Sequence, residues 1–333
     1  MGKRDSTIDL LRVLGTLLVI LAHVKIPKVM SEIRTFDVVL LVFISGMSLK
    51  YAKHKHYFVY IKKRIKKLLI PAWTTVSIIL ICLFIGDKIV GPFSILNWKY
   101  VTHSYLLIDS GSIGAVWIVK VYLLIALLTP VIDYLEKKID SSIILIGSGY
   151  LVMVIFNYLS LITMKYLFIQ EYIIYAVQYS IIALMGLRFV KRKKSGIIIC
   201  VISIFVLLNS VIVTGSFEPS AFKYPPQTYY LSYGLLCSVI LYYILDNLKK
   251  YKISENNVII WLSTHSFSIY INHIYYLWLF FVFGKIGIRL NYVLEYLILI
   301  LSSILQTMIL EYLKNKKYNQ LIIEFCNNKW LKK

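Results

Sequence analysis

Residues 8–24 read IDLLRVLGTLLVILAHV, an apolar stretch that contains the ionisable side chains of Asp9, Arg12 and His23. A helix turns by about 100° per residue, so the steps from Arg12 to His23 bring these two side chains to within about 20° of one helix face. The rise between them is roughly 16 Å, about half the hydrocarbon thickness of a bilayer. Because ionisable side chains in a membrane helix are costly unless they face protein or water, this pair is a functional-site hypothesis.

A purely structural interpretation of the same stretch stays open. In it, Arg12 extends to the cytoplasmic interface and pairs with Asp9 one helical turn earlier, while His23 lies at the outer interface. Spacing alone does not favour either interpretation.

The composition of the chain indicates a membrane protein. Its 333 residues are 59% hydrophobic and only 16% charged, whereas soluble domains carry about 25% charged residues. The net charge of +21 would favour nucleic acid in a soluble chain, but here the Lys and Arg residues gather in particular loops, which is typical of membrane orientation. We therefore expect no nucleic-acid partner. The four cysteines form no CxxC pair, and no histidine cluster has ligand spacing, so no metal site is expected.

Apolar runs of about 18 residues or more predict an all-α integral membrane protein with about ten transmembrane helices in a single bundle. We assign one domain over residues 1–333, because no linker or repeat divides the chain. Of the 37 Lys and Arg residues, 26 fall in the segments that share a side with the N-terminus and nine in those opposite, which predicts that both termini are cytoplasmic. The predicted spans are 8–24, 35–52, 69–86, 113–135, 141–162, 172–190, 196–214, 228–247, 258–284 and 291–313.

Five segments occur in an order that carries a family resemblance. Arg12 followed by His23 resembles the first-helix signature of the membrane-bound acyltransferase type 3 family. The other four resemble its motifs on later helices, with Lys67 where that family usually has Arg, and Phe267 where it has Tyr. These four are Phe43-Ile44-Ser45-Gly46-Met47, Arg64-Ile65-Lys66-Lys67-Leu68-Leu69-Ile70-Pro71, Ala115-Val116-Trp117-Ile118-Val119 and Ser266-Phe267-Ser268-Ile269-Tyr270-Ile271-Asn272-His273.

The resemblance implies an O-acyltransferase of the bacterial cytoplasmic membrane. Such an enzyme moves an acyl group, usually acetyl, from cytoplasmic acyl-CoA to a hydroxyl of an extracytoplasmic or lipid-linked glycan, and it needs no bound cofactor. Histidine suits a general base and arginine suits phosphate, so His23 and Arg12 are the expected catalytic residues. The residues expected to bind acyl-CoA or the acceptor are Arg64, Lys67, Ser45, Gly46, Trp117, Lys120, Tyr270 and His273.

Several alternatives stay open. A polysaccharide or lipid-linked sugar exporter would also have ten spans, although it would not need the Arg12–His23 pair. Gly46 suits close helix packing, Lys120 could extend to the interface, and His273 could make a core hydrogen bond. The expected partners are membrane lipids, the glycan acceptor and acyl-CoA, with a second copy of the chain or polysaccharide-synthesis proteins as further partners.

Overall fold

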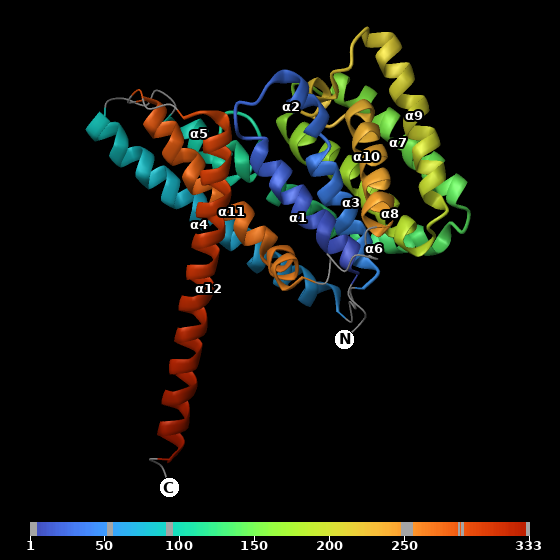
Figure 1. Ribbon diagram of the computed structural model, residues 1–333. Helices are drawn as coiled ribbons and strands as arrows, with labels where there is room; N and C mark the ends of the chain where they lie inside the picture. The colour runs from blue at the N-terminus through green and yellow to red at the C-terminus, as the bar shows by residue number, and fades with distance from the viewer. Residues whose placement is uncertain are drawn as a thin grey trace.

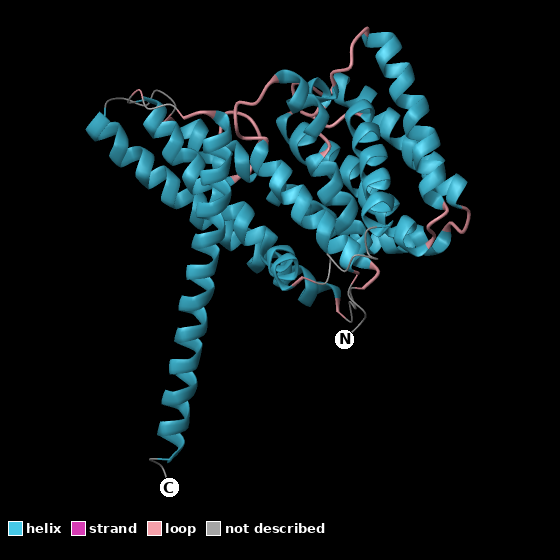
Figure 2. Cartoon of the chain, viewed as in Figure 1, coloured by secondary structure: helices cyan, strands magenta, loops and turns pink. Residues whose placement is uncertain are grey.

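The structure is a computed structural model, and it describes residues 5–51, 56–90, 96–247, 256–285, 287 and 290–330. The predicted all-α fold is confirmed, since the described residues form helices, turns and loops without a β-strand (Figure 2). The long helices are α1 (Ser6–Leu21), α3 (Asp37–Leu49), α4 (Tyr57–Val90), α6 (Trp117–Lys138), α7 (Ser142–Ile162), α8 (Tyr175–Lys191), α9 (Ser195–Thr214), α10 (Thr228–Asn247), α11 (Asn257–Lys285) and α12 (Tyr292–Trp330). The short ones are α2 (Lys28–Arg34), α5 (Trp98–Tyr105), η1 (Gly114–Val116), η2 (Ile169–Ile174) and η3 (Pro219–Phe222).

Eight helices among the described residues are long and apolar enough to cross a membrane, which indicates a multi-pass membrane protein. Helices α1 and α3, with 16 and 13 residues, are shorter than the eighteen or so residues of a typical span. Each predicted span coincides with a helix, but the count of ten stays a prediction. Helix α1 begins and α12 ends on the same side of the molecule (Figure 1), as two cytoplasmic termini would require; their orientation also stays a prediction.

Two helix bounds differ from the predicted spans in ways that matter for the site. Helix α1 ends at Leu21, because the N–H groups of His23 and Val24 donate to carbonyls only three residues back, at 3.1 and 3.3 Å. His23 therefore lies in a turn, just beyond the helix on which the sequence placed it. Helix α4 begins at Tyr57, well before the predicted span of 69–86, because Lys and Arg are good helix formers.

Helices α3 and α8 pack closely at the centre of the bundle. In the candidate membrane span formed by η2 and α8, 83% of the apolar stretch is buried inside the protein. In α9, which lies at the periphery, only 17% is buried. A Cβ atom added to Gly46 would lie 2.0 Å from the carbonyl oxygen of Ala183, and one added to Gly186 would lie 2.2 Å from that of Phe43. Two glycines on facing helices therefore let the backbones meet.

Helix α1 is positioned by its N-cap residue and by the helices around it. The Asp5 side chain accepts the Thr7 N–H at 3.1 Å and caps the helix. Helix α1 packs against α3, α10 and α11, as Figure 1 shows for α3 and α11 on its two sides. A small apolar cluster, made of Ile20, Val24, Ile269 and Leu299, holds its far end to α11 and α12. Residues near both ends of α1 are thus fixed by the bundle.

Candidate active site

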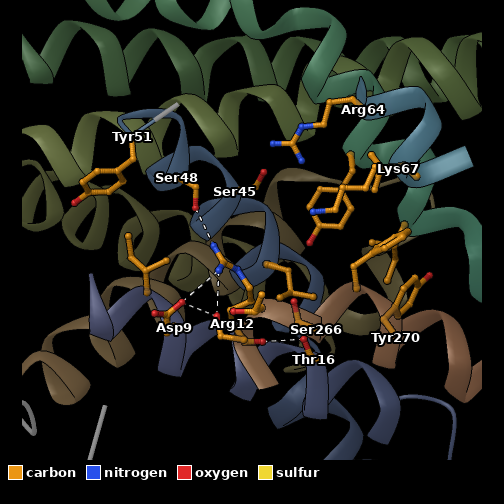
Figure 3. Close-up of a pocket in the computed structure, with 18 of the residues that line it drawn as sticks. Asp9, Arg12, Thr16, Ser45, Ser48, Tyr51, Arg64, Lys67, Ser266 and Tyr270 are labelled. Atoms are coloured by element: carbon orange, nitrogen blue, oxygen red, sulfur yellow. Dashed lines mark hydrogen bonds and ion pairs between the residues drawn. The ribbon is translucent and has the colours of Figure 1, made fainter. Parts of the chain in front are cut away.

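A cavity of about 550 Å³ lies between α1, α3, α4, α6 and α11; we call it the Arg12 cavity. Figure 3 shows Asp9 and Arg12 reaching into it from α1, Ser45 and Ser48 from α3, and Arg64 and Lys67 from α4. Its charged lining consists of three cations, Arg12, Arg64 and Lys67, and two carboxylates, Asp5 and Asp9. The lining therefore carries one more positive than negative charge.

A hydrogen-bond network holds the Arg12 guanidinium in place. It donates to the Ser48 hydroxyl at 3.0 Å and to the Ser263 hydroxyl at 3.1 Å. It also contacts the buried Asp9 carboxylate at 3.4 Å, and Ser263 donates to the same carboxylate at 2.6 Å. Arg12 thus does pair with Asp9, yet its side chain keeps 29% of its surface exposed, towards the cavity. Both interpretations of Arg12 agree with part of this geometry.

Arg64 and Lys67 bring further positive charge to the cavity wall. They are three residues apart on α4, so they share a helix face. Lys67 experiences the like charges of Arg64 and Arg12, while Arg64 lies over the Tyr60 ring at 5.3 Å. No ion pair joins either side chain to a carboxylate among the described residues. Such a group of cations suits an anionic ligand.

A second cavity, of about 830 Å³, lies beyond the other end of α1; we call it the His23 cavity. The side chains in its lining that can carry a charge near neutral pH are His23, Lys25 and Glu295. Its remaining walls are largely apolar side chains of α11 and the start of α12, among them Trp278 and Phe281. Of the three ionisable residues in the opening sequence stretch, Asp9 and Arg12 therefore line one cavity and His23 lines the other.

The wall between the cavities is built by α11 and the residues before α6. Tyr270 lines the Arg12 cavity, Ala115 lines the His23 cavity, and the Tyr270 hydroxyl donates to the Ala115 carbonyl. One turn further along α11, His273 is fully buried. Its ring centre lies 5.4 Å from that of Tyr270 and 5.2 Å from that of His23. Tyr270 and His273 thus lie between the two cavities.

A cluster of charged side chains around buried Asp37 also acts electrostatically on His23. The Asp37 carboxylate accepts from Arg34 at 2.6 Å and from Lys223 at 3.3 Å, and the positive charges of Lys223 and Arg34 both act on His23. Burial opposes the charge of Lys223, but Asp37 and then Tyr224 raise the pKa of Lys223 above its ordinary value. Lys223 therefore stays charged beside the His23 cavity.

Trp117 and Lys120 of α6 line neither cavity. Lys120 is buried and pairs with Glu171 of η2, and its ammonium lies 4.4 Å from the centre of the Tyr175 ring. Trp117 packs edge-on against Tyr175 and Tyr224, at 5.7 and 5.4 Å. Lys120 does not extend to the interface; it is part of a buried cluster, and Gly46 likewise serves the packing of α3 on α8.

The chain matches a known protein family. The family described as an acyltransferase domain, acyltransferase 3, matches residues 5–312, so the match includes both cavities and the wall between them. The chain belongs to the acyltransferase 3 family. No match was found among curated proteins or among solved structures. Membership of this family indicates that the protein is an acyltransferase.

The sequence analysis predicted some of the residues that line the Arg12 cavity. Arg12, Ser45, Arg64, Lys67 and Tyr270 meet in the Arg12 cavity. Residues that support them from elsewhere in the chain were missed, because no local pattern links them to Arg12 or Lys120. Those residues are Ser48, Ser263, Tyr122 and Glu171. Among the described residues, no group of three or more His, Cys, Asp or Glu side chains could hold a metal ion.

Proposed function

We propose that the protein is a membrane O-acyltransferase that moves an acyl group, usually acetyl, from cytoplasmic acyl-CoA to a hydroxyl of an extracytoplasmic or lipid-linked glycan. The observation that carries the proposal is the pair of cavities separated by the Tyr270–Ala115 wall, one lined by three cations and the other by His23. In this proposal the protein lies in the bacterial cytoplasmic membrane with both termini in the cytoplasm.

The Arg12 cavity is proposed to hold the donor. Arg64 and Lys67 have no carboxylate partner among the described residues, so they can bind the phosphates of CoA. Arg12, held by Ser48 and Ser263, then positions the pantetheine arm of the donor, which carries the thioester at its end. A volume of about 550 Å³ is that of a typical ligand pocket.

The His23 cavity is proposed to hold the acceptor. His23 removes the proton from the acceptor hydroxyl, whose oxygen attacks the thioester carbonyl carbon, and the carbon–sulfur bond then breaks. The proton passes from His23 to the departing thiolate, so the products are the ester and free CoA thiol. Because Arg12 and His23 are roughly 16 Å apart along the helix axis, the donor arm must pass the Tyr270–Ala115 wall for the thioester to reach His23.

Purified protein in proteoliposomes, supplied with radiolabelled acetyl-CoA and candidate cell-envelope glycans, tests the proposal. We expect label on a glycan hydroxyl together with stoichiometric release of CoA thiol. Transmembrane movement of an unmodified glycan, without label transfer, would favour the exporter and contradict the proposal.

A further inference from the structure

His273 is the buried side chain that lies nearest to the proposed chemistry without being used by it. It projects from α11 and is fully buried, and its Nδ1 atom makes a hydrogen bond with the Tyr270 carbonyl oxygen. A carbonyl oxygen can only accept, so Nδ1 carries a proton. Since the ring is fully buried and makes no ion pair with a described carboxylate, the imidazole is neutral and Nε2 holds a lone pair.

The Nε2 atom of His273 has no hydrogen-bond partner among the described residues. Buried polar atoms are normally paired, so each exception calls for an explanation. Other buried atoms, such as the Ser180 hydroxyl, also lack a partner, which means that the orphan nitrogen is not enough by itself. What distinguishes His273 is the second histidine beside it.

The His23 ring lies 5.2 Å from the His273 ring, centre to centre, with 38° between their planes. Two imidazoles joined by an N–H···N bond of about 2.9 Å have centres about 5 Å apart, since each nitrogen lies about 1.1 Å from its ring centre. A small rotation of His23, which is held by a turn and borders open space, can therefore join the two rings.

We propose that His273 is a positioning residue that accepts a hydrogen bond from His23 through Nε2 and thereby sets the tautomer of the base. The inference rests on the proposed function of His23. One ring nitrogen of His23 then donates to His273, which leaves the lone pair of the other nitrogen for the acceptor hydroxyl in the His23 cavity.

The same hydrogen bond serves the reaction step. When the hydroxyl proton moves to the free nitrogen of His23, the other N–H still points at His273, whose lone pair stabilises the imidazolium. In many hydrolases a carboxylate orients the base. Here an uncharged imidazole has that role, and its own orientation is fixed by the Tyr270 carbonyl of the wall.

Two variants separate the acceptor nitrogen from the volume of the ring. His273→Phe keeps a ring without an acceptor, whereas His273→Gln places an amide oxygen at about the position of Nε2. We expect kcat to fall about 100-fold in the Phe variant and at most about 10-fold in the Gln variant, with KM for acetyl-CoA unchanged. The control is His265→Gln. His265 lies on the same helix, but its ring pairs with Glu311 at 3.3 Å and not with His23. Full activity in the Phe variant, or equal losses in both, would overturn the inference.

A measurement on the unaltered protein removes the dependence on folding of the variants. Nitrogen-15 NMR of histidine-labelled protein in lipid reports which ring nitrogens carry protons. We expect His273 to be neutral with the proton on Nδ1, and proton placement on Nε2 would contradict the inference. An active His23→Ala variant would defeat the proposed base itself, whereas an inactive His23→Ala beside a fully active His273→Phe would defeat only the role of His273.

Discussion

The Tyr270 hydroxyl of α11 donates a hydrogen bond to the carbonyl of Ala115, and the two residues face different cavities. A single side-chain contact thus closes part of the wall between the group of cations and His23. Any group that passes from one cavity to the other must move this contact or pass beside it.

Tyr270→Phe keeps the ring and removes the hydrogen bond. We expect a loss of stability of about 1 kcal/mol, together with a several-fold rise in acetyl-CoA hydrolysis when no acceptor is present, because water reaches the donor through a looser wall. Release of CoA thiol in proteoliposomes measures this rise. The control is Tyr122→Phe, since Tyr122 lines the Arg12 cavity without a hydrogen bond to another described residue; a similar rise in both variants would speak against a wall at Tyr270.

Arg64→Gln and Lys67→Gln test whether the cations bind the nucleotide end of the donor. Each change should raise KM for acetyl-CoA about 10-fold and leave kcat nearly unchanged, because phosphate binding is used in the ground state and the transition state alike. Acetyl-pantetheine, which lacks the nucleotide, should be used equally well by the wild type and both variants.

The control for this prediction is Lys66→Gln, which removes a neighbouring cation of the same helix that lies outside the cavity lining. If the Lys66 variant lost as much affinity as the other two, the effect would reflect general surface charge. A loss with acetyl-pantetheine equal to the loss with acetyl-CoA would show that Arg64 and Lys67 do not contact the nucleotide.

Much of the fold could be predicted because hydrophobic length is a local property of the sequence. The predicted helix ends were wrong where something other than hydrophobicity decides where the helix begins or ends. Helix α1 stops at Leu21 because its last turn tightens, and α4 begins at Tyr57 because a run of Lys and Arg continues the helix. Neither the tightened turn nor the basic helical segment changes the length of an apolar run, so the hydropathy pattern does not reveal them.

The site could be predicted only in part. Arg12 and His23 stand out because each is costly in a membrane helix. The partners of Arg12 include Ser263, which is 251 positions away in the chain, and Lys120 meets Glu171 through α6 and the π-helical segment η2. Those contacts depend on how helices pack, and a single sequence does not specify that packing.

Gly46→Ala tests the close packing of α3 on α8. Its new methyl group would lie 2.0 Å from the Ala183 carbonyl oxygen, and backbone on both sides must move to make room, at a cost of about 1–3 kcal/mol. We expect a lower melting temperature in detergent. Gly147→Ala is the matched control, because nothing lies within 4 Å of its added methyl group and Ala favours the helix. Equal melting temperatures for the two variants would contradict the packing role.

The buried pair of Lys120 and Glu171 predicts non-additive effects on stability. Lys120→Met or Glu171→Met alone leaves one buried charged group without its partner and should cost about 3–5 kcal/mol. Lys120→Met combined with Glu171→Met removes both charges and should recover most of that loss. Unfolding of the three variants in detergent measures the coupling. Additive losses would indicate that the two side chains act separately, whereas Lys28→Ala, which breaks an exposed pair with Glu218, should change little.

Transfer by the His23→Gln variant tests the central claim most directly. Sealed proteoliposomes receive radiolabelled acetyl-CoA on the side of the termini and a glycan acceptor on the other side, and labelled glycan is measured against the wild type and a His103→Gln control. We expect the His23 variant to lose at least about 100-fold of the transfer rate while it binds acetyl-CoA normally, and the His103 control to keep its activity. Full transfer by the His23→Gln variant would contradict the account.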